Sequence, residues 1–273
     1  MVFKAENFTK REKWIVSEID PGFIHVQYNN PKTLNAYDTE DWKMYQEILT
    51  GLENDPETKI ILISSAVPKS FSSGLNLTSA MGLMSGKEDW SFKDREKFMY
   101  QHIREFQDAV TMPARMRTPT IALINGICFG LGLDLVSACS IRVVVEGARL
   151  SIREIKIGIV ADMGSLQRMS NLVNNKSLMY QYALTGEIFS AQDALSLGFV
   201  SKIVPDLESG LTYCKELGSN INQNEQWAIK GTKESIQYMV DGGTHEQGLL
   251  NIADYNAAQL VGGFPKNNFG SKL

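Results

Sequence analysis

The sequence predicts an α/β fold in which a mostly parallel sheet is covered by helices and is followed by a helical C-terminal region. Two observations lead to this fold class. Short apolar runs alternate with helix-like segments through residues 1–204, which is typical of a parallel sheet covered by helices. Beyond residue 204 the apolar residues recur at helical spacing. We therefore expect a core over 1–204 and a helical region over 205–273.

The chain begins with a predicted β-hairpin. Residues 15–16 and 23–28 are apolar runs, and Asp20-Pro21-Gly22 between them are turn formers. A helix is expected over 39–52 because the apolar residues of this segment fall on one helical face. These residues are Trp42, Tyr45, Ile48, Leu49 and Leu52.

Three apolar runs, at residues 59–64, 120–124 and 141–145, are predicted to be buried strands. A helix over about 132–139 joins the second strand to the third. Between the first two strands lies a long excursion over 78–97, rich in Gly, Met and Ser and then in charge, before a helix that runs to about residue 116. Long excursions in compact domains are usually functional or mobile.

The C-terminal part contains a last predicted strand over 198–204. Three helical stretches follow, over 207–221, 225–240 and 244–260. Their apolar stripes must be buried against the core or against a neighbouring subunit.

The composition argues against several classes of function. The 273 residues are 43% hydrophobic and 21% charged, with a net charge of −4, which argues against a nucleic-acid partner. Cys128, Cys139 and Cys214 have no metal-ligand spacing, so we expect three buried thiols and no metal site. No apolar run has the length of a membrane span, and the N-terminus lacks the apolar region of a secretory signal.

The C-terminal tripeptide Ser271-Lys272-Leu273 is a peroxisomal address when it stands at the free carboxyl end. Chance is the alternative, because all three residue types are common. The position favours the address, so we expect import into the peroxisomal matrix by a receptor.

Several familiar catalytic motifs are missing from the sequence. There is no Gly-x-Ser-x-Gly elbow and no phosphate-binding loop. Gly130-Leu131-Gly132 has no third glycine at Leu135, so the dinucleotide fingerprint fails. His25, His102 and His245 are isolated in sequence, which favours core or surface roles for all three.

Three loops remain as candidates for one site. They span residues 71–77, residues 125–134 and residues 153–168. Glycine clusters bring backbone N–H groups close to a ligand, and a turn that opens onto a helix suits a developing anion. Tight packing of a strand against a helix would need the same glycines, so the second loop alone does not decide between these alternatives.

In this order and spacing, the three loops resemble the crotonase (enoyl-CoA hydratase/isomerase) superfamily. The similarity runs over about 23–204 and includes Thr185-Gly186 and the segments 190–194 and 197–200. It implies a spiral of ββα turns, a C-terminal helical region that builds homotrimers or homohexamers, and acyl-CoA substrates. It also implies catalysis without a cofactor, since coenzyme A is part of the substrate.

The resemblance further implies an oxyanion hole of two backbone N–H groups, which by position belong to Leu75 and Leu131. Members commonly have Gly where Leu131 stands and Asp where Asn76 stands. A backbone donor tolerates a changed side chain when its φ/ψ is kept. The residues that the resemblance places around the substrate are Ala36, near the CoA adenine, and Ser73, Gly74, Asn76, Leu77 and Gly132.

Carboxylates separate the reactions within this family. Hydratases carry Glu at the positions of Asp134 and Glu154 and a Gly-rich stretch where Asp162 falls. Here all three positions are acidic, and residues 161–168 resemble the Δ3,5-Δ2,4-dienoyl-CoA isomerase subgroup. The resemblance assigns Asp162 to proton removal at C2 and Glu154 to proton delivery at C6. Asp134 would orient or electrostatically tune the pair.

Such a reaction needs a separate base and acid, because one carboxylate cannot easily reach both ends of a diene. Neighbouring carboxyl groups in an apolar pocket should have perturbed, coupled pKa values. The alternatives are surface acids without a catalytic role, a hydratase or Δ3,Δ2-enoyl-CoA isomerase on the same scaffold, and a non-catalytic acyl-CoA-binding or scaffold protein. The residues that either line an acyl tunnel or pack in the core are Met81, Leu83, Met84, Trp90, Phe92 and Met99.

Overall fold

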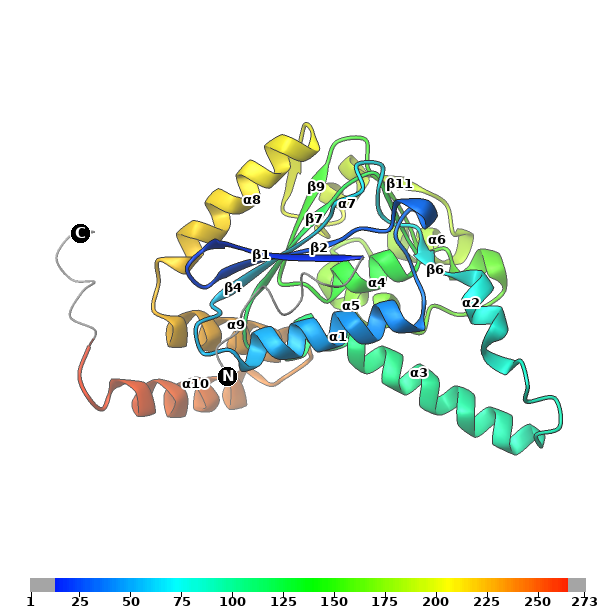
Figure 1. Cartoon of the computed structure of the whole chain (residues 1–273). Coiled ribbons are helices and arrows are strands. Elements are labelled where there is room, and N and C mark those ends of the chain that lie inside the picture. The colour runs from blue at the N-terminus through cyan, green and yellow to red at the C-terminus, as the bar shows by residue number, and fades with distance from the viewer. Residues whose placement is uncertain (1–12, 265–273) are drawn as a thin grey trace.

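A six-stranded sheet forms the centre of the protein (Figure 1), in a computed structural model that describes residues 13–264. The predicted targeting tripeptide at residues 271–273 lies outside the described residues. β1 pairs antiparallel with β2, and the other neighbours pair in parallel. In spatial order the strands are β1 (Trp14–Asp20), β2 (Phe23–Tyr28), β4 (Ile60–Ser65), β7 (Thr120–Ile124), β9 (Ile141–Val145) and β12 (Lys202–Val204).

Two smaller sheets lie beside the first. The four-stranded sheet consists of β11 (Phe189–Ser190), β10 (Arg149–Ser151), β8 (Ile127–Phe129) and β5 (Ser70–Ser72). A two-stranded parallel pair is formed by β3 (Ala36–Tyr37) and β6 (Gly74–Leu75). These short strands end at the loops that the sequence singles out for function.

Helices cover the sheets and extend from them. The α-helices are α1 (Thr39–Asn54), α2 (Leu77–Met81), α3 (Phe92–Arg115), α4 (Leu131–Ser137), α5 (Ser165–Leu172), α6 (Lys176–Thr185), α7 (Ala191–Ser196), α8 (Leu207–Asn222), α9 (Gln226–Val240) and α10 (His245–Leu260). Single 3-10 turns are η2 (Pro31–Thr33), η3 (Gly82–Met84) and η4 (Glu154–Ile157).

The chain winds as a spiral of ββα turns. β4 of the large sheet leads to β5 of the second sheet and then to α2 and α3. β7, β8 and α4 repeat this order, and β9, β10 and α5 repeat it again. Because β5, β8 and β10 pair in parallel, the turns that follow these strands come close together although they are far apart in the sequence.

The core has two parts, one on each face of the large sheet. The larger cluster lies between the sheet, α1 and the helices of the spiral, and it includes the predicted face of α1. The smaller cluster is covered by α8, where Phe23, Leu62, Leu123 and Cys214 are buried. Complete burial of a side chain of this size contributes about 1.5–3 kcal/mol. Hence α8 closes the second face of the sheet.

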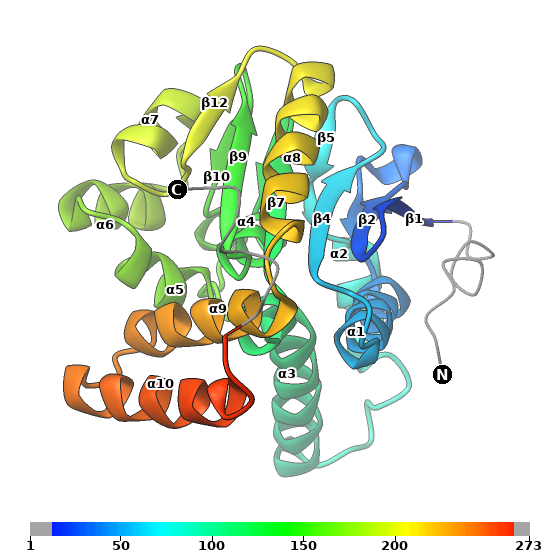
Figure 2. The same ribbon diagram turned by 90° about the vertical axis from the view of Figure 1, so that its left-hand side faces the viewer.

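α9 and α10 lie beyond the sheet as a helical pair (Figure 2). Leu249 and Leu250 of α10 remain exposed. No helix of the described chain is long and apolar enough to cross a membrane.

Most predicted elements are confirmed, with the strands 120–124 and 141–145 found at the predicted residues. Two predicted boundaries are wrong: the helix after the excursion begins at Phe92 rather than after residue 97, and the last strand begins at Lys202 rather than Gly198. Gly198 has a φ of +76°, which turns the chain out of the extended conformation there. Cys128, Cys139 and Cys214 are free and buried, as expected.

Candidate active site

The three loops singled out by the sequence line one cavity of about 610 Å³. β6 brings the first loop to it, the β8–α4 turn brings the second, and η4 with the segment before α5 brings the third. The candidate site residues that line this cavity are Ser73, Gly74, Leu75, Leu77, Leu131, Asp134, Glu154 and Asp162.

The first two loops meet at Gly74. Tyr37 of β3 pairs with Leu75 of β6 in parallel, which fixes the position of β6. Gly74 has a φ of +106°, and a Cβ placed on it would lie 3.0 Å from the Phe129 carbonyl oxygen and 3.8 Å from the Leu131 nitrogen. Only a residue without a side chain allows so close an approach. The backbone next to Leu75 therefore lies beside the Leu131 amide.

Leu131 is the first residue of α4, and an N–H at this position has no partner within its helix. Among residues 13–264 the non-glycine residues with positive φ are Leu34 and Asn35, so Leu131 occupies an ordinary conformation. The left-handed position falls instead on Gly130, with a φ of +52°. The leucine thus fits where members of the family commonly have glycine, and its N–H remains available to a ligand.

Glu154 lies against the same turn. A Cβ on Gly130 would stand 3.1 Å from Oε1 of Glu154. Burial raises the pKa of Glu154 to about 7, with further upward contributions from the nearby carboxyl groups of Asp134 and Asp162. Its Oε2 is buried without a hydrogen-bond partner in the described part of the chain. This carboxyl group can therefore hold a proton near neutral pH and release it to a ligand.

Asp134 is 1% exposed and sits on the first turn of α4. Its Oδ1 accepts a hydrogen bond of 2.6 Å from the Ser165 backbone amide, at the start of α5. Its Oδ2 has no hydrogen-bond partner within residues 13–264. Burial raises the pKa of Asp134, although the Ser165 hydrogen bond and Arg168 oppose this change. Asp134 thus faces Glu154 while anchoring the third loop.

Asp162 is half-buried and lines the same cavity, three residues before Ser165. Burial raises its pKa. Gln107 of α3 donates a 2.6 Å hydrogen bond from Nε2 to the Asp162 backbone carbonyl. A carboxylate with a raised pKa is a stronger base than an ordinary one, provided it stays ionised.

The far part of the cavity is apolar. His102, Ile103 and Phe106 of α3 line it together with Trp42 of α1. Trp42 stacks on Phe106 with ring centroids 4.8 Å apart. His102 contacts both rings, and burial lowers its pKa, which favours the uncharged imidazole. His102 thus packs among aromatic side chains at the cavity wall.

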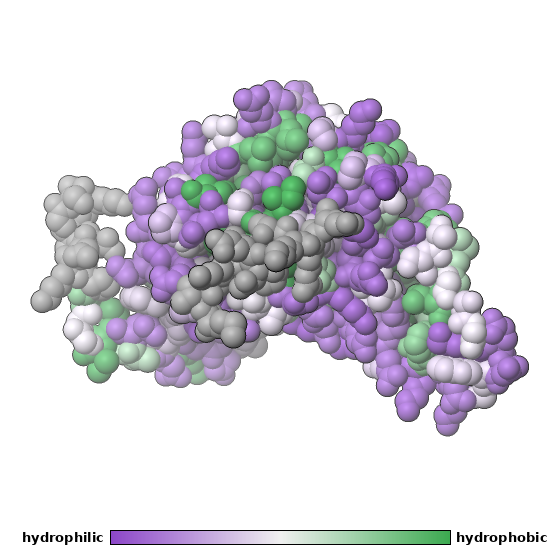
Figure 3. All heavy atoms as spheres, viewed as in Figure 1, coloured by the Kyte–Doolittle hydropathy of each residue, from purple (hydrophilic) through white to green (hydrophobic). Residues whose placement is uncertain are grey.

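The residues expected either to line an acyl tunnel or to pack in the core differ in their positions. Leu83 and Met99 line the cavity. Met81 and Phe92 are each 77% exposed instead, and Figure 3 shows apolar side chains on the surface over this α2–α3 corner. Part of the segment over 78–97 therefore lines the cavity, and part of it is exposed at the surface.

Three candidate residues do not line the cavity. Ala36 is buried beneath Tyr28, whose hydroxyl donates to its carbonyl. Asn76 caps α2, with its side-chain oxygen accepting from the Ser79 amide. Gly132 faces the Ser72 side chain, because a Cβ there would approach Ser72 to 3.0 Å.

Sequence patterns missed two cations at this site. Arg153 and Lys156 line the cavity, and the Arg153 guanidinium lies over the Phe129 ring at 4.9 Å. Their positions next to Glu154 in the third loop are the feature of the sequence that could have predicted them. A ligand with anionic groups would find positive charge on this side.

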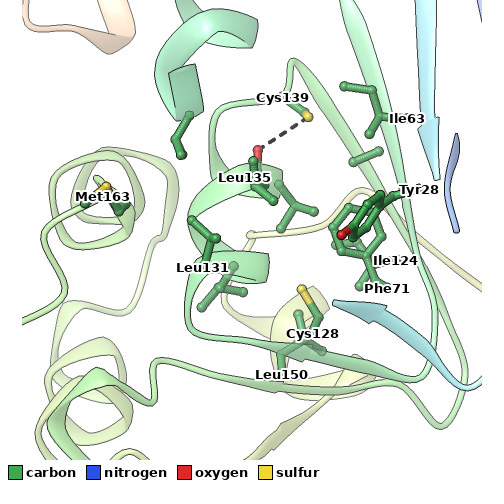
Figure 4. Packing of buried hydrophobic residues seen from close by; sticks show 14 of the residues in the cluster. Tyr28, Ile63, Phe71, Ile124, Cys128, Leu131, Leu135, Cys139, Leu150 and Met163 are labelled. Atoms are coloured by element: carbon green, nitrogen blue, oxygen red, sulfur yellow. Dashed lines mark hydrogen bonds between the residues drawn. The ribbon is translucent and has the colours of Figure 1, made fainter. Parts of the chain in front are cut away.

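Along α4, the side chains of Leu131 and Leu135 lead to Cys139 just beyond the helix (Figure 4). The Cys139 thiol contacts the Leu135 carbonyl. The packed apolar side of α4 holds the helix in place, so that the Leu131 amide and the Asp134 carboxyl have fixed positions at the cavity.

Comparison with known sequences finds similar proteins over most of the chain. The family model for enoyl-CoA hydratase/isomerase matches residues 18–255. The peroxisomal Δ(3,5)-Δ(2,4)-dienoyl-CoA isomerase of Arabidopsis thaliana is 33% identical over 246 residues, 89% of this chain and 86% of that protein. The mitochondrial enzyme of the same name from Homo sapiens is 31% identical, covering 87% of this chain and 72% of its own length.

Structural comparison agrees on the fold. The crystal structure of an enoyl-CoA hydratase from Bacillus anthracis superposes with a TM-score of 0.80 and 23% identity, covering 90% of each chain. The predicted fold class, a crotonase-like spiral with a helical C-terminal region, is confirmed.

Proposed function

The chain belongs to the enoyl-CoA hydratase/isomerase family, and we propose that it is an isomerase that converts 3,5-dienoyl-CoA thioesters into 2,4-dienoyl-CoA thioesters. The observation that carries this proposal is the presence of Asp134, Glu154 and Asp162 on one cavity, with the amides of Leu75 and Leu131. Relatives named for this activity, about a third identical over most of the chain, support it.

In the proposed reaction, the Asp162 carboxylate removes a proton from C2 of the substrate. The electron pair moves into the conjugated system, and negative charge collects on the thioester oxygen. The N–H groups of Leu75 and Leu131 stabilise this charge by hydrogen bonding, which typically contributes about 2.7–4 kcal/mol for each such donor.

Glu154 then delivers a proton to C6. The C3–C4 and C5–C6 double bonds become C2–C3 and C4–C5 bonds, so one proton is lost and one gained. A pKa of about 7 suits Glu154 as an acid at neutral pH. Burial raises that pKa, Asp134 adds to the rise, and Asp134 also holds the third loop through Ser165. After turnover Asp162 is protonated and Glu154 ionised, and proton exchange with water restores both.

We propose that catalysis uses no metal or nucleotide cofactor, since these side chains and amides supply every proton transfer and the anion stabilisation. Arg153 and Lys156 lie where the CoA phosphates would benefit from positive charge. The apolar part lined by His102, Ile103 and Phe106 is suited to the acyl chain.

The test uses Asp162→Asn, which keeps the size of the side chain and removes the base. We expect this variant to fold, to bind an acyl-CoA in calorimetric titration, and to lose at least about 100-fold in turnover of a 3,5-dienoyl-CoA. The product is followed through the ultraviolet absorbance of its diene conjugated with the carbonyl. Unchanged turnover would reject the assignment of Asp162.

A second substrate separates the alternatives on this fold. Hydration of a 2-enoyl-CoA to a 3-hydroxyacyl-CoA would indicate a hydratase. Movement of a single double bond from C3 to C2 would indicate a Δ3,Δ2-enoyl-CoA isomerase. A protein that binds acyl-CoA but turns over none of these esters would be non-catalytic.

We further propose assembly into a homotrimer or homohexamer and residence in the peroxisomal matrix. Exposed Leu249 and Leu250 on α10 support a covered face in the assembly. Ser271-Lys272-Leu273 supports receptor-mediated import, and relatives of the same name include peroxisomal and mitochondrial proteins. Light scattering tests the assembly, and microscopy of a fluorescent fusion with and without these three residues tests the location.

A further inference from the structure

A second cavity has a volume of about 670 Å³. α9 forms one wall, and the chain from the end of α4 to the start of β9 forms another. Within the described chain the two cavities share no lining residue. The second cavity meets α4 at Ser137 and is also lined by Cys139, which lies at the opposite end of the helix from Leu131 (Figure 4).

Three cations line this cavity: Arg142, Arg168 and Lys233. Arg142 and Lys233 are only 9% and 8% exposed. Each of the three acts electrostatically on the Cys139 thiol, so their charges converge on one corner of the cavity. We call this set, with Cys139, the cationic corner.

The cations donate to neutral oxygens rather than to carboxylates. Lys233 Nζ donates to the carbonyls of Ala114, at 2.6 Å, and Met116. Arg142 Nε donates to the Phe199 carbonyl at 2.6 Å. Among residues 13–264, no carboxylate lies within 4 Å of a side-chain nitrogen of these three cations. The ion pairs at that distance involve Lys13, Arg115 and Arg117.

Arg168 separates the second cavity from the catalytic one. Its Nη2 donates to the carbonyls of Asp134, at 2.9 Å, and Met163, at 2.8 Å. These are also neutral acceptors, so the guanidinium charge has no ion-pair partner among the described residues. Asp134 interacts with it electrostatically from the catalytic side.

A buried cation without a paired anion is costly, and an anion supplied by a ligand would offset that cost. Lysine has three N–H donors, and two are used by the carbonyls, which leaves one for a ligand. Burial lowers the pKa of Lys233 to about 8, although Glu53, Asp241 and Glu234 act on it electrostatically in the opposite direction. The cationic corner is therefore suited to an anionic head group.

The rest of the cavity is apolar. Its aliphatic lining includes Ile141, Leu172, Ile229, Ile236 and Val240. A volume of about 670 Å³ lies in the usual range for small-molecule sites. Charge at one corner and aliphatic walls elsewhere complement an unbranched chain that ends in a single anion.

We propose that this second cavity binds an amphiphile with an aliphatic chain and one anionic head group, such as a free medium-chain fatty carboxylate. The head group pairs with Arg142, Arg168 and Lys233, and the chain lies along α9. The site is separate from the one proposed for catalysis and does not depend on that function.

Calorimetric titration of the full-length protein with decanoate tests this proposal. We expect saturable binding and at least tenfold weaker binding of decanol, which has a similar chain and no charge. Decyl sulfate distinguishes a general anion site, which binds it comparably, from one selective for carboxylates. Either result for decyl sulfate supports the proposal, whereas decanol binding as tight as decanoate overturns it.

Variants locate the bound decanoate. Ala228→Trp fills the second cavity from α9, and Ala80→Trp fills the catalytic cavity from α2. We expect decanoate affinity to fall at least tenfold in Ala228→Trp and to persist in Ala80→Trp. The reverse pattern places decanoate in the catalytic cavity and overturns the proposal, as does the absence of binding to the unaltered protein.

Two lysine variants of α9 test whether positive charge in the cationic corner contributes to decanoate binding. Lys233→Met removes a cation of the corner, whereas Lys230→Met removes a cation of α9 that does not line the cavity. At least tenfold weaker binding in Lys233→Met, with unchanged binding in Lys230→Met, is the expected result. Equal affinity in both folded variants contradicts the proposal. If Lys233→Met does not fold, the pair of tryptophan variants still decides.

Discussion

The Ser165 backbone amide donates a 2.6 Å hydrogen bond to Oδ1 of Asp134, and this bond joins α4 to the segment that carries Asp162. α4 also provides the Leu131 amide. One buried carboxyl group thus fixes the relative position of the anion-binding turn and the proposed base. The same carboxyl group acts on Glu154 and raises the pKa of that residue.

Substitution of Asp134 separates these two roles. Asp134→Asn keeps an oxygen that can accept from Ser165 but removes the negative charge, so the pKa of Glu154 should fall. We expect the alkaline limb of the rate profile to move to lower pH by about 1 unit, as measured by turnover of a 3,5-dienoyl-CoA from pH 5 to 9. Asp254→Asn, on exposed α10, is the control. An unmoved limb would show that Asp134 does not tune Glu154.

Asp134→Ala removes the acceptor as well. Loss of a hydrogen bond to a charged group costs about 1.5–3 kcal/mol, so we expect a lower free energy of unfolding than in Asp134→Asn. Chemical denaturation measures this difference. Equal stability of the two variants would mean that the Ser165 bond does not hold the loop.

Glu154 gives a prediction that links pH to stability. Its folded-state pKa is about 7, above the ordinary value of 4.5, so the folded protein binds more protons than the unfolded chain between these values. This contribution to stability is present below about pH 4.5 and is lost as pH rises through about 7. Glu154→Gln cannot ionise, and at pH 8 it should unfold with a free energy higher than that of the unaltered protein by about 2–3 kcal/mol.

The same variant should lose turnover by about 100-fold or more, because glutamine cannot deliver a proton. The stability difference should shrink toward pH 4.5, as followed by urea denaturation at several pH values. A constant difference across this range would contradict the raised pKa. Retained turnover would remove Glu154 from the proposed proton delivery.

The sequence predicted the parts of this site that depend on local pattern. Residues 120–124 and 141–145 are apolar and β-branched, and such runs specify buried strands. The resemblance of the three loops to a known family predicted that Asp134, Glu154 and Asp162 lie together. The ββα spiral was expected from that resemblance alone, because its turns have loops of different lengths and give no regular pattern in the sequence.

Contacts between distant segments could not be predicted in this way. Gln107 reaches Asp162 across 55 residues, and Lys233 reaches Ala114 across 119. A glutamine or lysine on an amphipathic helix has no local signal that separates a buried donor from a solvated side chain. The second cavity likewise depends on how α9 packs, which its apolar spacing alone does not determine.

Gln107 is expected to position Asp162 without contacting the substrate. Gln107→Ala removes the donor to the Asp162 carbonyl, so the base should become less well placed. We expect turnover to fall about tenfold or more, since small misplacements of a reacting group are costly, with KM and the pH profile little changed. Gln101→Ala, on the exposed side of the same helix, is the control. Equal turnover in both variants would exclude a positioning role.

Gly130→Ala tests the close approach beneath Glu154. Its φ of +52° and ψ of −119° strain a residue with a side chain by about 1–3 kcal/mol, and its Cβ would also stand 3.1 Å from Glu154 Oε1. Gly147 has a φ of +80° and no atom within 4 Å of such a Cβ, so Gly147→Ala bears the backbone cost alone. Both variants should lose stability in thermal denaturation, but only Gly130→Ala should lose turnover, because its methyl group displaces the acid beside the Leu131 amide. Equal activity in the two variants would show that the site tolerates a shift of Glu154.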